Sequence, residues 1–547
     1  MGSGNLFTKT ILNYGEFFSG LGWHSKALNL FDLVLKIDPN NVKSWYDKGN
    51  LYKRQKEFKK SLYCFDKALK INPNHSRTWH LKANLLEEMG EKEDSERCSL
   101  KAIECYKKDL EIESSNPTTW YNVGIVYQNL GKHEESLTNF SKCIELDPEY
   151  SEAWFKKAID LVMLEKYEES LKCFDESLKL SPGNYKALMS KAIVLETLEN
   201  YYLALACLNR VIKIKDRHLP AYYHKIDVFM EMDEYDDALA TADEIISFSP
   251  GDDKALYKRG WVLYFLKRYG ESLESFEDAI KINPKNIQYW GSKGTVFDKM
   301  KNFSEALFCF DKALEIDEKD PYVWSSKARE LYQLKRYPES LNSYDKVLEF
   351  DPENASAWNW KGSILAEMGD NTATEYLEAS IKFHDLAFEK DPTDQGVLSG
   401  KASVLEILQR YDEALESVNK AIKLDSKDYW NLNLKSRILR KLGRYEEALK
   451  YSDQALEINP DDSDCYYEKG RILCDLKKYE EALTLFEKAF EQNNLDEKSL
   501  YAKGIILKVL NHEKESKECF KKAKSINSYF KFDKLVLKDL TGDKNEI

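Results

Sequence analysis

The chain has 547 residues, and its 43% of hydrophobic residues is enough to bury a core. Its formal net charge of −13 disfavours nucleic acid as the main ligand, because phosphate binding relies on clustered lysine and arginine. No run of eighteen apolar residues occurs, so neither a transmembrane helix nor a membrane partner is expected.

Residues 1–7 are expected to be a short leader, or a remnant of an expression vector, ahead of the first structural element. They lack the basic region and apolar run of a signal peptide. Gly2 fits the start of an N-myristoylation motif, but Leu6 stands where that motif requires Ser or Thr. The ten cysteines form no CxxC pair and no short disulfide framework. A cytoplasmic location is therefore expected.

Tryptophans recur at a fixed interval along most of the chain. Trp45 and Trp79 are 34 residues apart, as are Trp120 and Trp154. A 34-residue period is typical of a helix-turn-helix repeat array. With Trp45 taken as position 4 of its repeat, fifteen repeats begin at residues 8, 42, 76, 117, 151, 185, 219, 253, 287, 321, 355, 395, 429, 463 and 497.

Each repeat predicts two closely packed helices, A and B. Positions 4, 8 and 11 make one apolar or small stripe on helix A, as in Trp45, Gly49 and Tyr52. Position 8 is Gly or Ala in thirteen repeats, which lets helix B approach closely. Helix B has its own stripe at positions 20, 24 and 27, and a proline at position 32 ends it in nine repeats. The Asn or Asp that often follows caps the next helix A.

Two repeats are longer than the others. The third carries 7 extra residues near 91–106, and the eleventh carries 6 near 370–380. Seven residues are about two helical turns, which preserves the hydrophobic face of a helix. These insertions are expected to lengthen or bulge the helix pairs of the two repeats.

This pattern closely resembles the tetratricopeptide repeat family over residues 8–530. The resemblance implies an all-α fold, a right-handed α-solenoid or superhelix of about fifteen helix-turn-helix units. It also implies a concave groove lined by the A helices, in which family members bind peptides or protein surfaces. Residues 531–547 are expected to form a capping segment and tail, with the segment near 528–540 covering the last repeat.

No catalytic, cofactor or metal residues are predicted. The repeats leave no room for a catalytic domain, and no phosphate-binding glycine loop or HExxH motif occurs. Equivalent positions in neighbouring repeats are separated by a whole helix pair, too far for one metal ion. The cysteines at position 23 are therefore interpreted as small buried apolar residues: Cys64, Cys98, Cys173, Cys207, Cys309 and Cys519.

Lysine or arginine occupies position 7 in thirteen repeats, as in Lys48, Lys82 and Arg259. A basic rail for an acidic polymer is one interpretation. At about 100° per residue, however, position 7 lies roughly opposite positions 2, 5, 9 and 12 of helix A, which are the candidate groove lining. The favoured interpretation is that these cations lie along a packed edge and pair with carboxylates of helix B.

The candidate groove lining changes character along the chain. In repeats 4 to 8 it is apolar and aromatic, whereas repeats 9 to 12 contribute small polar residues such as Gly291, Ser363 and Ser399. Repeats 13 and 14 then contribute arginines. Either the aromatic stretch packs neighbouring A helices together or it is a partner-binding cradle. The predicted cradle residues are Tyr121, Phe155, Ile159, Met189, Tyr223, Tyr257, Trp261 and Tyr264.

Two binding modes of the family are rejected from the residues. The carboxylate clamp for the acidic tails of heat-shock chaperones (Hsp70 and Hsp90) needs Lys at position 5, and no repeat has it. The asparagine ladder needs Asn at position 6 in successive repeats, and only Asn13 and Asn122 qualify. Three functions remain: a non-catalytic scaffold for a protein or peptide segment, a dedicated subunit of a larger enzyme assembly, and an RNA-binding repeat protein.

Overall fold

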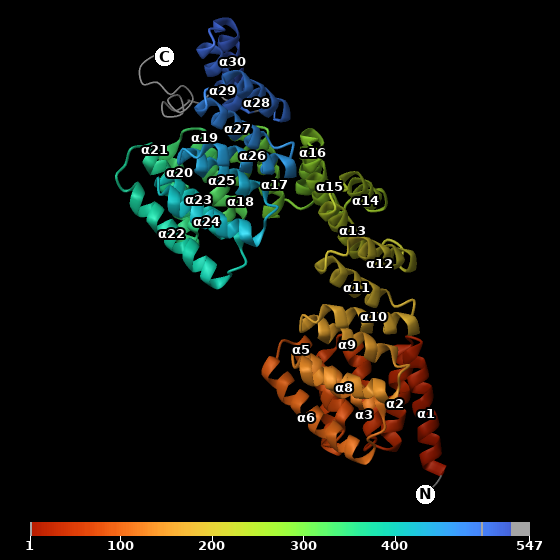
Figure 1. The fold of residues 1–547 in the computed structure, drawn as a ribbon. Helices are drawn as coiled ribbons and strands as arrows, with labels where there is room; N and C mark the ends of the chain where they lie inside the picture. Colours follow the sequence, from red (N-terminus) through yellow and green to blue (C-terminus); the bar gives the residue numbers. More distant parts are fainter. Residues whose placement is uncertain (1–2, 494–495, 527–547) are drawn as a thin grey trace. The chain divides into compact units, whose positions relative to one another are not determined.

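The computed structural model describes residues 3–493 and 496–526, and in these residues it contains thirty α-helices and no β-strand (Figure 1). The predicted all-α fold of paired helices is confirmed. Odd-numbered helices are the A helices of successive repeats and even-numbered helices are the B helices. The predicted capping segment near 528–540 lies outside the described residues.

The A helices are α1 Ser3–Gly20, α3 Val42–Arg54, α5 Ser76–Glu88, α7 Pro117–Asn129, α9 Ser151–Met163, α11 Tyr185–Thr197, α13 Leu219–Glu231, α15 Asp253–Phe265, α17 Ile287–Lys299, α19 Pro321–Gln333, α21 Ala355–Glu367, α23 Gln395–Ile407, α25 Tyr429–Lys441, α27 Ser463–Asp475 and α29 Glu497–Val509. The B helices are α2 His24–Ile37, α4 Phe58–Ile71, α6 Lys92–Ile112, α8 His133–Leu146, α10 Tyr167–Leu180, α12 Tyr201–Ile214, α14 Tyr235–Phe248, α16 Tyr269–Ile282, α18 Phe303–Ile316, α20 Tyr337–Phe350, α22 Ala373–Lys390, α24 Tyr411–Leu424, α26 Tyr445–Ile458, α28 Tyr479–Gln492 and α30 Glu513–Ile526.

From the second repeat on, every helix A begins at the first residue of the repeat read from the sequence. The first repeat differs, because α1 already begins at Ser3, five residues before the repeat read from the sequence. The insertions lengthen helix B: α6 has 21 residues and α22 has 18, where α4 has 14.

Helix A and helix B begin in different ways. The Asn or Asp before helix A accepts a hydrogen bond from a backbone N–H of the first turn, as Asn184 does for α11 and Asp428 for α25. Helix B has no such side-chain cap at α10 or α24, whose first turns instead carry acidic residues that suit a helix N-terminus. In the A–B turn, position 15 has a positive φ whether it is Gly131 or Lys267.

The core of each repeat is a contact between position 8 of helix A and position 24 of helix B. A Cβ atom added to Gly260 would lie 2.6 Å from the ring of Phe276, which is fully buried. The same contact recurs between Gly49 and Phe65. Small residues at position 8 therefore allow a large aromatic ring to fill the space between the two helices, as predicted.

The chain divides into two bodies, which are described separately: an N-terminal body, Met1–Thr241, and a C-terminal body, Ala242–Ile547. In both bodies a helix A typically packs between its own helix B and the helix B of the preceding repeat, as α9 does between α10 and α8 and as α25 does between α26 and α24. Within the C-terminal body, Lys301 in the turn after α17 lies 3.7 Å from Glu497 at the start of α29. Six repeats therefore bring this body back into contact with itself.

All ten cysteines are buried free thiols, as the interpretation of position 23 predicts. Burial raises the pKa of the Cys309 thiol to about 12, with Lys293 opposing the shift. No helix in the described part of the chain has both the length and the apolar character needed to cross a bilayer.

Candidate functional site

We call positions 2, 5, 9 and 12 of the A helices the A-helix face. Neighbouring A helices touch one another directly, for example α7 with α9 and α25 with α27. Side chains of this face also bridge successive helices, because position 12 of one repeat reaches position 9 of the next. Asp298 binds Arg329 at 3.2 Å, and Glu406 binds Arg437 at 2.8 Å. At these contacts the A-helix face continues from one repeat to the next.

The N-terminal body holds five of the predicted cradle residues: Tyr121, Phe155, Ile159, Met189 and Tyr223. All five side chains are half-buried. The ring of Tyr121 stacks on Tyr150 at 5.0 Å between centroids. Phe155, Ile159 and Met189 pack against the core of repeats 5 to 7. Each side chain therefore packs partly on the core and is partly accessible. This arrangement is compatible both with packing between A helices and with a partner-binding cradle.

The C-terminal body holds the other three predicted cradle residues, Tyr257, Trp261 and Tyr264. All three lie on α15 and are half-buried. Tyr257 and Trp261 lie 5.8 and 5.9 Å from the core ring of Phe276. Trp261 also packs edge-on against Tyr264 at 5.3 Å. Burial raises the pKa of the Tyr264 hydroxyl, and the neighbouring Tyr269 adds to that shift. These rings form one aromatic group on a single helix.

Three small polar residues of repeats 9 to 12 use their hydroxyl groups within their own helices. Thr295 donates to the carbonyl of Gly291, Ser363 to that of Asn359, and Ser403 to that of Ser399. Hydroxyls bonded in this way are not available donors for a second chain. The small side chains still leave space, since nothing lies within 4 Å of a Cβ added to Gly291.

The arginines of repeats 13 and 14 are paired with carboxylates of the A helices, either of a neighbouring repeat or of their own helix. Arg440 is buried and its Nη1 donates to Asp475 at 3.1 Å. Glu468 is also buried, and Arg471 reaches it at 3.4 Å. Burial alone would raise the pKa of Glu468, but Arg471, Arg440 and Arg437 hold that pKa below its usual range. In this part of the A-helix face, side chains are therefore joined by ion pairs rather than by apolar contacts.

The cations at position 7 pair with carboxylates of helix B, as predicted. Ten of the thirteen contact position 25 of the preceding repeat, for example Lys82 with Asp66 at 2.7 Å and Lys503 with Glu487 at 2.8 Å. Lys435 lies over the ring of Tyr451 instead. These pairs join successive repeats, so this series of cations is not a rail exposed to an acidic polymer.

Sequence reasoning missed two fully buried carboxylates, Asp160 and Glu330, both at position 10 of helix A. Asp160 accepts hydrogen bonds from Gln128 at 2.9 Å and lies 2.9 Å from the His133 ring nitrogen. Neither oxygen of Glu330 has a hydrogen-bond partner. Thirteen repeats have an apolar residue at this position, so the departure from the repeat pattern was a signal that could have found both.

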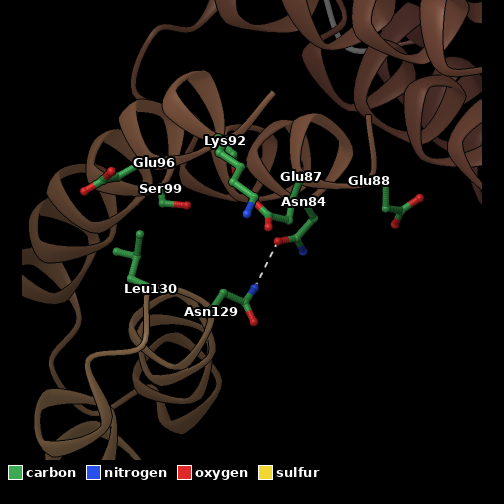
Figure 2. Close-up of a pocket in the computed structure, with 9 residues that line it drawn as sticks. Asn84, Glu87, Glu88, Lys92, Glu96, Ser99, Asn129 and Leu130 are labelled. Carbon is green, nitrogen blue, oxygen red and sulfur yellow. Dashed lines mark hydrogen bonds between the residues drawn. The ribbon is translucent and has the colours of Figure 1, made fainter. Parts of the chain in front are cut away.

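A cavity of about 530 Å³ lies beside the N-terminal half of the long helix α6 (Figure 2). Asn84 of α5 and Asn129 of α7 share a hydrogen bond of 3.1 Å at its edge, which Figure 2 shows as a dashed line. Its lining is mostly polar and acidic, with Glu87 and Glu96 among it and Leu130 as an apolar member. Small-molecule sites are usually lined mostly by apolar side chains, so this cavity does not resemble one.

Among residues 3–493 and 496–526, no group of three or more His, Cys, Asp or Glu side chains is placed to hold a metal ion. The cysteines at position 23 lie in separate repeats, as their spacing in the sequence requires.

Family models described as "Tetratricopeptide repeat" match residues 42–75, 64–97, 117–150, 151–184, 253–286, 287–320 and 497–530, and one described as "TPR repeat" matches 328–369. A model described as "Anaphase-promoting complex, cyclosome, subunit 3" matches residues 401–489. Comparison with curated proteins finds no match.

The chain is similar in structure to several solved proteins. They include the APC/C hetero-tetramer Cut9–Hcn1, with 13% identity, a TM-score of 0.41, and coverage of 94% of this chain and 96% of that chain. Yeast Tom70 has 16% identity and a TM-score of 0.36, covering 82% of this chain and 96% of that one. A tetratricopeptide repeat protein from Parabacteroides merdae has 19% identity and a TM-score of 0.36, covering 50% and 98%.

Proposed function

Since this chain belongs to the tetratricopeptide repeat family, we propose that it is a non-catalytic scaffold that binds a segment of a partner protein along its A-helix face. We place this activity in the cytoplasm, in keeping with ten free thiols. The proposal needs no cofactor and no metal, because the scaffold acts by holding its partner.

The observation that carries the proposal is the aromatic group on α15. In this group the rings of Trp261 and Tyr264 lie 5.3 Å apart, and Phe265, at position 13 beside the A-helix face, contacts them at 6.3 and 5.5 Å and is 46% exposed. Aromatic side chains commonly carry a large share of interface energy, often about 2 kcal/mol or more each. A hydrophobic segment of a partner, helical or extended, would cover these rings.

The test uses two exposed phenylalanines in neighbouring repeats. A photoreactive phenylalanine analogue at Phe265 should cross-link one partner segment in the source cells. The same analogue at Phe308 on α18, which is 52% exposed on a B helix, should not. Cross-linking of the same segment from both positions would contradict the proposal.

The identified segment is then used for a binding measurement. Tyr264→Glu should weaken its affinity more than about tenfold, because a carboxylate would be desolvated in the contact. Phe308→Glu should leave the affinity unchanged. Tyr264 is a better position than Trp261, because Trp261 also rests on the core ring of Phe276 and its loss would lower stability as well. Unchanged affinity of a folded Tyr264→Glu chain would reject this face.

The second candidate is a dedicated subunit of a larger assembly. The match of residues 401–489 to the model of an anaphase-promoting complex subunit favours it. A subunit of this kind should never run alone in native extract, and size-exclusion of that extract would distinguish it from a free scaffold. RNA binding is disfavoured further, because Arg437 and Arg440 already pair with Glu406 and Asp475. A salt titration with RNA tests that alternative.

A further inference from the structure

The N-terminal half of the long helix α6 departs from the repeat pattern at position 24. Nine repeats have Phe or Tyr at this position, and the ring fills the space between helices A and B, as Phe276 does against Gly260. In the third repeat position 24 is Ser99 and position 8 is Ala83, so both facing residues are small. The ring follows seven residues later as the buried Tyr106. The insertion has therefore moved the ring away from the place where other repeats have it.

The cavity of about 530 Å³ in Figure 2 lies at that place. In the eighth repeat the ring at position 24 lies beside position 9 of helix A, because Trp261 is 5.9 Å from Phe276. In the third repeat position 9 is Asn84, and both Asn84 and Ser99 line the cavity. Asn84 also belongs to the A-helix face. The cavity is thus a site at this face where a missing ring has left space.

The greater length of α6 also separates the A helices on either side of the cavity. Contact between α5 and α7 is weaker than contact between α3 and α5 or between α7 and α9. The second half of α6 packs on α7, with Ile103 and Leu110 in one cluster with Val123. The side chains of Asn84 and Asn129 join α5 to α7 through their hydrogen bond of 3.1 Å. The first half of α6 therefore faces the cavity instead of a neighbouring helix.

Ser99 is the most buried of the residues that line the cavity, with 4% of its surface exposed. In the part of the chain that the structure describes, its hydroxyl has no hydrogen-bond partner. Ser95, one turn earlier, donates to the carbonyl of Ala83 in the usual way. Figure 2 shows the Ser99 hydroxyl pointing into the space bordered by Asn84 and Asn129. Buried polar groups are normally hydrogen-bonded, so this hydroxyl indicates a polar ligand.

The charges around the cavity favour a cation. Three carboxylates, those of Glu87, Glu88 and Glu96, and the single ammonium group of Lys92 give the lining a net charge of −2. Glu88 pairs with Lys53 at 3.0 Å. Within the described residues, neither Glu87 nor Glu96 has an ion-pair partner. A positively charged group that enters the cavity would therefore meet carboxylates that are not yet neutralised.

We propose that this cavity binds the side chain of an arginine that belongs to a partner protein. A guanidinium group carries only N–H donors, which suit the acceptor oxygens of Ser99 and Glu87. Its methylene groups would lie against Leu130, the apolar member of the lining. This site goes beyond the aromatic group on α15, because it lies in the N-terminal body and recognises a charge. Its test therefore needs neither that group nor the natural partner.

Ligand-detected NMR of the purified whole chain tests the proposal with a capped tripeptide that has arginine between two glycines. Saturation transfer should be strongest at the arginine side chain. The citrulline tripeptide has the same shape without the charge and should bind more than about tenfold more weakly, because charge-assisted hydrogen bonds are the stronger ones. The lysine tripeptide should also bind more weakly, since an ammonium group lacks the forked donors. An arginine peptide that binds no better than either of the others would overturn the proposal.

Four variants tie the binding to the cavity. Ser99→Phe should restore the ring, fill the cavity and abolish binding of the arginine peptide, with the helical circular dichroism spectrum retained. Glu87→Gln should weaken binding more than about tenfold, because one charge-assisted contact is lost. Lys92→Gln should strengthen it by removing a like charge. Glu93→Gln, on the same helix outside the cavity, is the matched control and should leave the affinity unchanged.

The signs of these changes decide the outcome even if Ser99→Phe fails to fold. Weaker binding by Lys92→Gln together with stronger binding by Glu87→Gln would indicate an anion site and overturn the proposal. Equal effects of Glu87→Gln and Glu93→Gln would show that the peptide responds only to the overall charge of the chain, which would overturn it as well.

Discussion

At the scale of single residues, the clearest departure from the repeat pattern is an acidic side chain at position 10, where most repeats have an apolar one. Glu330 is fully buried at position 10, and its carboxylate oxygens have no hydrogen-bond partner. Asp160 occupies the same position in another repeat, and its Oδ1 accepts a hydrogen bond from Gln128 and lies beside the His133 ring, while its Oδ2 has no partner. His133 itself replaces the aromatic residue that most repeats have at position 17, as in Tyr167. Asp160 therefore has hydrogen-bond partners on one oxygen, whereas Glu330 has only the guanidinium of Arg329, whose Nε lies 3.6 Å from its Oε1.

Glu330→Val is expected to stabilise the protein, because valine is the residue of several other repeats at this position. Removing a buried unsatisfied polar group should raise the free energy of unfolding by about 1–3 kcal/mol. The matched control is Asp160→Val, which leaves His133 and Gln128 without their acceptor and should stabilise little or destabilise. Urea denaturation of both variants measures the difference. Equal stabilisation by the two changes would show that partners do not matter at this position.

Glu330 should also make the free energy of unfolding depend on pH. Burial raises the pKa of Glu330 from 4.5 to about 8, with Asp298 adding to the shift and Arg329 opposing it. Because the folded state holds this proton more tightly than the unfolded state, the stabilisation is full below about pH 4.5 and is lost as pH rises towards 8. Glu330→Gln should flatten that part of the stability profile between pH 5 and 8. An unchanged slope in denaturation curves would assign the dependence to other groups.

At the scale of the helix, helices A and B have different structural roles. In most repeats helix A is started by a side-chain cap, and it carries both the face towards its neighbours and the A-helix face. Helix B supplies the large ring of the core and the carboxylate at position 25, as Asp66 does for Lys82. The capping rule came directly from the sequence, since an Asn or Asp before a helix has a local effect that needs no tertiary contact.

Asn184→Ala should therefore lower the free energy of unfolding by about 1 kcal/mol, because the backbone N–H of Ala187 loses its acceptor. Lys166→Ala, at the start of the uncapped helix α10, should change it by only a few tenths. Thermal unfolding of the two variants makes the comparison. A loss of equal size at both positions would mean that the Asn184 side chain does not act as a cap.

At the scale of the molecule, the repeat pattern predicted nearly every helix boundary, because the same residues start and end the helices in each repeat. It did not predict the bridges along the A-helix face. The pairing of Glu406 with Arg437 depends on how one repeat sits on the next, and no single repeat contains that information. The early start of α1 at Ser3 was also missed, since residues before the first repeat fall outside the period.

The ion pair between Lys301 and Glu497 has a mechanical consequence for the C-terminal body. Contacts between adjacent repeats alone would make a coil equally compliant to extension and to compression. A coil whose successive turns already touch across six repeats cannot be shortened any further at that point. It yields when pulled along its axis but resists being shortened, so its stiffness differs in the two directions.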